Sequence, residues 1–231
     1  MGDPTWLFLL PEVPFDRLRS AGLAIMPTGP GRWHAGMLHR AGEDSAYLLH
    51  LAWDHDLRNA PPSREYAWVQ LDLPPARLLS IAAMCRRIAK IHARPEGGLP
   101  YAFRYRETAF GVDGRILLGK SEYGLTCATF ILAVLRSAGV DLLRFAEWHH
   151  RDGDVERHHE LLAMLRGDPR IAADHLAAVA SEVRCTRYRP EEVVGAASSA
   201  PLPVSFIDAQ AAAGHITRTF ALRTASTTST P

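Results

Sequence analysis

The sequence predicts an α+β protein in which antiparallel hairpins and amphipathic helices occupy separate stretches. Two runs with alternating character, 32–39 and 46–53, flank a polar turn at 42–45 and indicate a hairpin. After Thr126, apolar residues recur at the helical period until Gly139, which ends the run. The composition, with 47% hydrophobic and 22% charged residues, is typical of a chain that buries one sizeable core.

Length and charge limit the organisation of the chain. Its 231 residues favour one domain, and a formal net charge of +1 gives no strongly basic surface, so we expect no nucleic-acid partner. We expect a single domain over 1–215. The low-complexity end of the chain predicts a flexible Ser/Thr-rich tail over 216–231.

The remaining elements follow from hydrophobic patterns and turn residues. In chain order we expect a short strand or helical turn at 6–10, an irregular Pro- and Gly-rich segment through 31, the hairpin described above, a third strand at 68–73, a helix at 75–93, a second hairpin at 109–118 around Asp113-Gly114, the helix after Thr126, helices at 155–166 and 171–183, and a helical turn after Pro190.

The cysteines and the N-terminus bear on location. Three scattered cysteines, Cys85, Cys127 and Cys185, favour free thiols in a reducing compartment. The apolar run at 6–10 lacks the basic region and cleavage site of a signal peptide. No apolar run approaches the roughly 20 residues that cross a bilayer. We therefore expect a cytoplasmic protein without membrane insertion, although signal-independent export would leave no trace of this kind.

Cys127 is the candidate nucleophile. It lies in the first turn of the expected helix, where the helix dipole and unpaired N–H groups favour the thiolate. His34 and His50 share a face of the first hairpin if its loop has an odd number of residues, and a loop centred on Gly42 would place them directly opposite. In this interpretation His34 takes the thiol proton, His50 orients His34, and N–H groups at the helix start stabilise an oxyanion.

Two alternatives concern these same residues. His55 could replace His50 as the third residue if the strand contains a bulge. Cys127 could also be an ordinary core residue, because free cysteine is among the most buried residue types. The same fold would then serve as a non-catalytic binding or inhibitory module.

Other patterns offer competing chemistry. The stretch 114–121 matches the phosphate-binding pattern Gly-x4-Gly-Lys-Ser, but Gly114 lies in an expected hairpin turn and Gly124 interrupts the chain before the next helix, unlike a P-loop. Arginines at 184, 187 and 189 form a basic patch that could meet an acidic substrate. A further cluster could recruit zinc, namely His149, His150, Asp152, Asp154, His158 and His159. It lacks a clear pair at i, i+4 supported by cysteine, so we expect no metal and no cofactor.

Two short motifs resemble the circularly permuted branch of the NlpC/P60 papain-like superfamily. They are His34-Ala35-Gly36-Met37-Leu38 and Leu125-Thr126-Cys127-Ala128-Thr129-Phe130-Ile131, within roughly 30–140 of the chain. Members of that branch carry the histidine strand before the cysteine helix. The resemblance implies a papain-like fold, with the cysteine helix packed on a small antiparallel sheet and extra helices C-terminal to it. It also implies a catalytic Cys-His pair with a polar third residue on the next strand, here Cys127, His34 and His50.

The motifs depart from both characterised branches of that superfamily. The Asp-Cys-Ser-Gly pattern of the unpermuted peptidoglycan hydrolases is here Thr126-Cys127-Ala128-Thr129, and the Asn-Cys-Glu-His pattern of the lecithin retinol acyltransferase relatives is missing. The resemblance therefore implies a thiol hydrolase that cleaves an amide (peptide, isopeptide or side-chain amide) or an ester. It does not name the substrate.

Overall fold

The computed structural model describes residues 6–9, 13–42, 45–94, 97–107, 110–117 and 124–227. Its centre is a six-stranded sheet with the order β1-β6-β2-β3-β4-β5, in which every pairing is antiparallel. The strands are β1 (Leu7–Phe8), β2 (Ala21–Gly29), β3 (Arg32–Arg40), β4 (Ala46–Trp53), β5 (Asp56–Ala60) and β6 (Ala67–Gln70). With the helices, they confirm the predicted α+β class.

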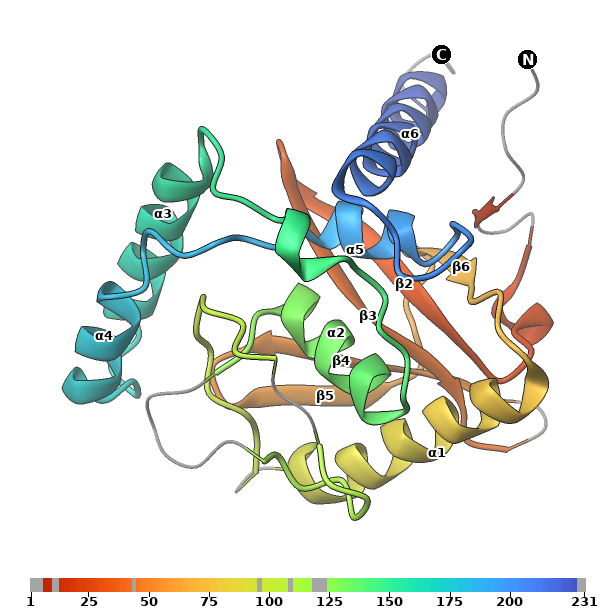
Figure 1. The fold of residues 1–231 in the computed structure, drawn as a ribbon, viewed down its shortest axis with the longest axis horizontal. Coiled ribbons are helices and arrows are strands. Elements are labelled where there is room, and N and C mark those ends of the chain that lie inside the picture. The colour runs from red at the N-terminus through yellow and green to blue at the C-terminus, as the bar shows by residue number, and fades with distance from the viewer. Residues whose placement is uncertain are drawn as a thin grey trace.

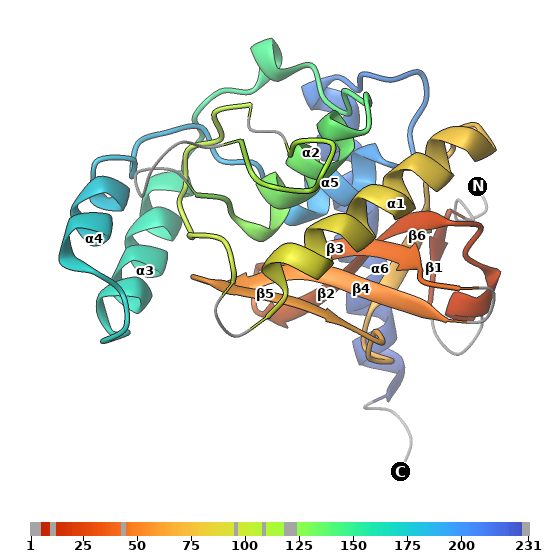
Figure 2. The same cartoon turned by 90° about the horizontal axis from the view of Figure 1, so that it is seen from below.

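Six α-helices lie within these described ranges: α1 (Pro75–His92), α2 (Cys127–Ser137), α3 (Asp154–Arg166), α4 (Ala173–Ala180), α5 (Pro190–Ala196) and α6 (Phe206–Thr227). Short 3-10 turns occur at Phe15–Arg17 and Phe145–Glu147. Helices α1 and α2 cover one face of the sheet, and α3 and α4 lie beyond one end of it (Figure 1, Figure 2). Helix α5 packs on β2 and β3. No described helix combines the length and the apolar character needed to cross a membrane.

Alternation along the strands divides the buried side chains into two layers. On the face under α1 and α2, Ala35 and Met37 of β3 join a large core that also contains Phe130 of α2. On the opposite face Leu38 joins a smaller cluster, whose other buried members are Leu18, Ala24, Leu48, Tyr66 and Trp68. The start of α2 therefore meets a sheet that is packed on both sides.

Most of the expected elements are present. The first hairpin is confirmed as β3 and β4, and the third strand as β6. The expected helices at 75–93, after Thr126, at 155–166, at 171–183 and after Pro190 correspond to α1 to α5. The short strand expected at 6–10 is β1.

The expectation of an irregular segment through residue 31 is wrong, because residues 21–29 form the central strand β2. Gly22 and Pro27 both fit this strand for local reasons. A Cβ at Gly22 would come within 2.5 Å of the Val69 carbonyl oxygen of β6, so the close approach requires glycine. Pro27 lies where the register with β3 shifts.

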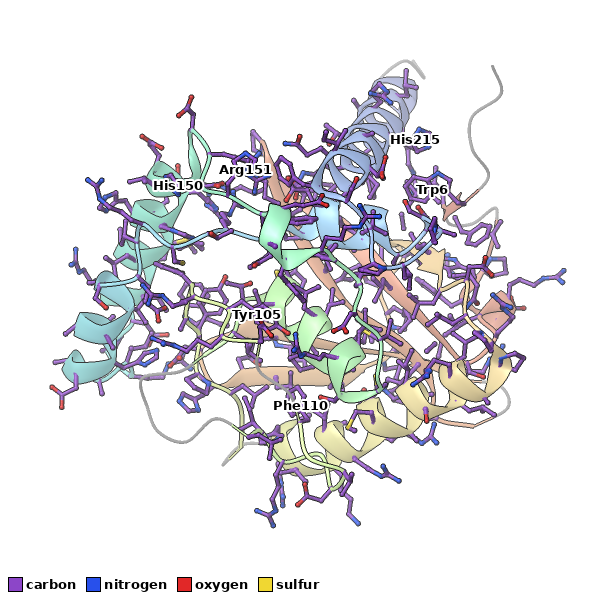
Figure 3. The ribbon with its side chains drawn as sticks, in the orientation of Figure 1. Trp6, Tyr105, Phe110, His150, Arg151 and His215 are labelled. Carbon is purple, nitrogen blue, oxygen red and sulfur yellow. The ribbon has the colours of Figure 1, made fainter. Side chains whose placement is uncertain are left out.

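Residues 216–227 are helical, unlike the flexible tail expected from their composition. Helix α6 continues through them to Thr227, and Ile216 and Phe220 are buried in the main core. Earlier in this helix His215 packs against Trp6 near the N-terminus, with ring centroids 5.2 Å apart (Figure 3). Tertiary packing therefore orders this stretch, while 228–231 lie outside the described residues.

The second expected hairpin is much smaller than the sequence suggests. It consists of one antiparallel bridge, Phe110↔Ile116, closed by a turn in which the Gly114 N–H donates to the Gly111 carbonyl at 2.8 Å. Residues 109 and 118, its expected ends, lie outside the described residues.

Candidate active site

Helix α2 begins at Cys127 because Thr126 caps it. The Thr126 hydroxyl accepts a hydrogen bond from the Thr129 N–H at 3.2 Å, and Thr129 Oγ1 accepts one from the Thr126 N–H at 2.7 Å. This reciprocal pair is a capping box in which threonine replaces the usual Glu or Gln. The Thr-Cys-Ala-Thr motif therefore has a structural reason: it holds Cys127 as the first residue of the helix.

The loop before α2 lies tightly against the segment around Tyr101. The Leu125 N–H donates to the Pro100 carbonyl at 3.0 Å. A Cβ at Gly124 would come within 2.5 Å of the same carbonyl oxygen, so only glycine permits this approach. The contact brings Tyr101 to the start of the helix.

Cys127 is buried, with 7% of its surface exposed. Burial raises the pKa of its thiol, and hydrogen bonds from the backbone N–H groups of Ala35 and Ala128 lower it only in part. The Ala128 amide at the helix start favours the thiolate, as expected, but desolvation outweighs it. Cys127 rests as a thiol at neutral pH and needs a base to become a nucleophile.

His34 and His50 contact each other through their rings. His34 Nε2 lies 2.6 Å from His50 Nδ1, and the rings meet edge to face with centroids 4.8 Å apart. Gly36 makes room for this contact, since a Cβ there would lie 2.6 Å from the His50 Cβ. The two histidines expected on one face of the hairpin thus form a hydrogen-bonded pair.

The register of the hairpin differs from the expected one. Residues 41–45 connect the strands, and the pairs run from Arg40↔Ala46 to Met37↔Leu49. Continuing this register places His50 opposite Gly36, so the expectation that His34 and His50 are directly opposite is wrong. The rings meet diagonally instead, within the reach of long side chains across a strand pair.

Both imidazoles are neutral at neutral pH. Burial lowers the pKa of each from 6.5 to about 4, and Arg58 contributes to both shifts. One proton lies between the two rings. If His34 Nε2 donates it to His50 Nδ1, the lone pair of His34 Nδ1 is left to accept another proton. This tautomer turns His34 into a base.

Cys127 meets β3 at Ala35, the residue after His34. The described pairing of β3 with β4 begins beyond Ala35, which leaves its N–H for the Cys127 sulfur. Burial raises the pKa of Tyr101 in the main core and of Tyr66 in the cluster on the opposite face, and a thiolate at Cys127 would raise both further. By the alternation along β3, the His34 ring lies on the face opposite Ala35, and among the described contacts none joins His34 to Cys127 directly.

A cavity of about 40 Å³ lies beside Cys127. It is bounded by the start of α2, one face of α3 and the segments around 101 and 188. Side chains with aromatic rings or positive charge dominate its walls, including Trp33, Tyr101, Phe103, His158, Arg187 and Tyr188.

Buried polar groups hold the cavity wall in place. Glu182 is 3% exposed, and its Oε2 accepts hydrogen bonds from the Phe103 and Arg104 N–H groups, each at 3.0 Å. His175 Nε2 donates to the Tyr101 carbonyl at 2.9 Å. These bonds fix the backbone of 101–104 beside the thiol.

His158, expected in a possible zinc cluster, belongs to the cavity wall. Its ring stacks on Phe103 with centroids 4.4 Å apart, and Nδ1 donates to the Val183 carbonyl at 2.6 Å. Asp154 of the same cluster is bound by arginines. In the part of the chain that the structure describes, no three His, Cys, Asp or Glu side chains converge to hold a metal ion.

The alternatives for the third residue and for phosphate binding can be located. His55 lies in the exposed turn after β4 with φ 51, and its N–H donates to the Leu99 carbonyl at 2.9 Å, whereas the ring partner of His34 is His50. Gly114 has φ 85 and lies in a turn. The rest of the phosphate-binding pattern, 118–121, lies outside the described residues.

Sequence reasoning missed several residues of this neighbourhood. Tyr66, Tyr101 and Phe103 carried no motif, and His158 was assigned to a different chemistry. Arg187 was recognised as part of a basic patch but not as a neighbour of Cys127. For the aromatic residues among them, the only signal in the sequence is a ring in an otherwise polar or irregular segment. Such a signal does not show that the ring lies near Cys127.

The histidine pair predicts a loss of stability in acid. Because both folded-state pKa values, about 4, lie below the unfolded value of 6.5, the unfolded chain binds more protons between these limits. The contribution is complete above pH 6.5 and is lost as the pH falls to about 4, on the order of 3 kcal/mol for each histidine. Urea unfolding at several pH values should show a smaller fall for His34→Gln/His50→Gln than for the wild type. Parallel curves would contradict the lowered pKa values.

Comparison with known proteins adds no relative to this description. No protein-family model, curated protein or solved structure matches the chain. The resemblance to the permuted NlpC/P60 branch therefore rests on the short motifs around His34 and Cys127.

Proposed function

We propose that this protein is a thiol hydrolase with a papain-like arrangement of the permuted NlpC/P60 kind, in which Cys127 is the nucleophile, His34 the base and His50 its orienting partner. The observation that carries the proposal is the bond between His34 Nε2 and His50 Nδ1 at 2.6 Å, one residue away from the Ala35 amide that contacts the Cys127 sulfur. In the proposed tautomer His34 Nε2 is the donor of this bond, which leaves His34 Nδ1 able to take a proton.

The proposed reaction proceeds through an acyl-enzyme. The Cys127 sulfur attacks the carbonyl carbon of an amide or ester while its proton passes to His34 Nδ1. When the tetrahedral intermediate collapses, the C–N or C–O bond breaks and His34 returns the proton to the leaving amine or alcohol. Water then attacks the thioester, again with His34 as base, and releases the acid and the thiol.

A backbone N–H group at the start of α2 stabilises the negative charge that develops on the carbonyl oxygen of the substrate. The capping box occupies the Thr129 N–H and the Ala128 N–H bonds the Cys127 sulfur, so the donor we assign to the oxyanion is the N–H group of Cys127 in the same turn. Losing one such donor typically costs about 3 kcal/mol of transition-state stabilisation.

The test compares the three cysteines of the native protein. Cys185 is half-buried and Cys127 buried, so exposure alone predicts that Cys185 reacts first. Activation by His34 predicts the reverse, with Cys127 modified by iodoacetamide at least about 10-fold faster than Cys185 or Cys85. Peptide mass spectrometry over a time course measures the three rates. A rate at Cys127 no greater than that at Cys185 would refute the hydrolase.

The second candidate is a non-catalytic binding or inhibitory module on the same fold. The observation that favours it is the burial and raised pKa of Cys127, properties that it shares with the core residue Cys85. In that case Cys127→Ala costs only the packing of a small buried side chain, about 1 kcal/mol, and His34 has no effect on the thiol. The labelling rates separate the two candidates.

A further inference from the structure

Arg187 brings a positive charge into the wall of the Cys127 cavity. Its side chain is 19% exposed, so most of the guanidinium is removed from bulk water. In such a place a charge acts more strongly on its neighbours than it would at the surface. A small group that enters the cavity therefore meets Arg187 together with the thiol.

The carboxylates near Arg187 are shared with two other arginines. Asp154 accepts a hydrogen bond from Arg189 at 3.0 Å and one from Arg151 at 3.3 Å, while Arg187 Nη1 is 3.6 Å away. Arg151, beside the start of α3 in Figure 3, also binds Glu192. Three arginines thus face Asp154 and Glu192, with Glu191 as a third carboxylate in range of Arg187, so the set is formally neutral. Of the three arginines, Arg187 has the longest contact with Asp154.

Arg187 also acts on the reacting atom, the Cys127 sulfur. Arg187 lowers the pKa of Cys127, and Glu191, the acidic group that raises it, has the smaller effect of the two. Of these two charged side chains, Arg187 therefore has the larger effect on the sulfur, although burial still outweighs it. The rings of Trp33 and Phe103 line the cavity and limit the water that would weaken an ion pair there.

We infer that the cavity beside Cys127 selects substrates whose acyl group carries a carboxylate, and that Arg187 is the residue that binds it. The volume of about 40 Å³ restricts this group to a few heavy atoms. The inference rests on the proposed function, because it names the substrate class of the same thiol. It also connects the arginine patch near residue 187 to the chemistry of Cys127.

Iodoacetate and iodoacetamide test this inference, because they are nearly equal in size and differ in charge. With either reagent the Cys127 sulfur forms a bond to the methylene carbon, the C–I bond breaks, iodide leaves and the thiol proton passes to His34. The quantity measured is the rate with iodoacetate divided by the rate with iodoacetamide at Cys127, relative to the same ratio for glutathione. We expect this relative preference to be about 10-fold in favour of the anion, equivalent to about 1.4 kcal/mol.

Variants of the full chain assign the preference to one residue. Arg187→Gln should abolish the anion preference, and Arg187→Lys should retain part of it, because lysine keeps the charge without the planar fork. Arg166→Gln, at the exposed end of α3, is the matched control and should leave the ratio unchanged. Because an unfolded thiol would show the glutathione ratio, urea unfolding of Arg187→Gln must confirm that the variant is folded, and Cys127 in it must still react faster than Cys185.

The outcomes distinguish this inference from the proposed function. If Cys127 reacts faster than Cys185 but shows no anion preference in the wild type, or if Arg187→Gln keeps the preference, the carboxylate-binding inference is overturned and the hydrolase stands. If Cys127 reacts no faster than Cys185 with either reagent, both are overturned. An anion preference that disappears only in Arg187→Gln supports the inference.

Discussion

Replacing His34 with glutamine is expected to slow the alkylation of Cys127 at neutral pH by about 10²- to 10⁴-fold, the usual contribution of a general base. The side-chain amide of the introduced glutamine can still donate a hydrogen bond to His50 Nδ1, which lies 2.6 Å from His34 Nε2, so the packing is kept while the proton acceptor is lost. Burial and the raised pKa of Cys127 then leave an unassisted thiol. Stopped-flow or mass-spectrometric alkylation rates measure the effect.

The pH dependence separates a base from a structural histidine. Because the pKa of His34 is about 4, the wild-type rate should stay nearly constant as the pH is lowered from 8 to about 5.5. In His34→Gln the rate should fall about tenfold per pH unit, as expected when only the thiolate reacts. His39→Gln is the matched control, since His39 is a buried histidine of the same strand whose Nε2 contacts Asn59 at 2.9 Å. Equal slopes in all three proteins would exclude His34 as the base.

Replacing Gly36 with alanine is expected to reduce both stability and reactivity. The added Cβ would lie 2.6 Å from the His50 Cβ, 2.9 Å from Leu48 Cδ1 and 3.0 Å from the Leu49 carbonyl oxygen. Backbone and Cβ atoms cannot rotate away, so the strands must separate at a cost of about 1–3 kcal/mol. His50 is then displaced from His34, and a misplacement of about 1 Å in such a site can cost about 10²-fold in rate.

Urea unfolding and the Cys127 alkylation rate measure these two effects of Gly36→Ala. Gly42→Ala is the matched control, because a Cβ at Gly42, in the connection between the same strands, would meet nothing within 4 Å. We expect the control to unfold and react like the wild type. A Gly36→Ala protein with wild-type alkylation at native stability would show that the contact between His34 and His50 does not support the reactivity of the thiol.

Local patterns were sufficient to predict a helix or strand where one of its faces is buried and turn or capping residues mark its ends. The hairpin of β3 and β4 and helices α1 and α2 have such patterns, and their residues were found within a few positions. Strand β2 and helix α6 lack them. Glycine and proline in β2 and the Ala- and Thr-rich end of α6 have weak intrinsic preferences, and packing of residues such as Leu23 and Ile216 determines their structure.

The candidate site also has some features that local patterns predict and others that only packing determines. Periodicity and turn residues identified Cys127 at a helix start and His34 and His50 on neighbouring strands. They could not determine the register, because a loop centred one residue later changes which side chains face each other. They also could not determine the direction in which the pKa of Cys127 shifts. That direction depends on whether burial, which raises the pKa, outweighs the two backbone amides that lower it.

For this protein the sequence by itself determined an α+β chain with a cysteine at a helix N-terminus and two histidines on adjacent strands, because these features depend on short-range periodicity and caps. The tertiary structure decided that the rings of His34 and His50 meet at 2.6 Å, that Cys127 rests as a buried thiol against Ala35, and that Arg187 lies in the same cavity. These contacts join segments far apart in the chain, such as β3 and the loop before α5, and depend on packing that local patterns do not contain.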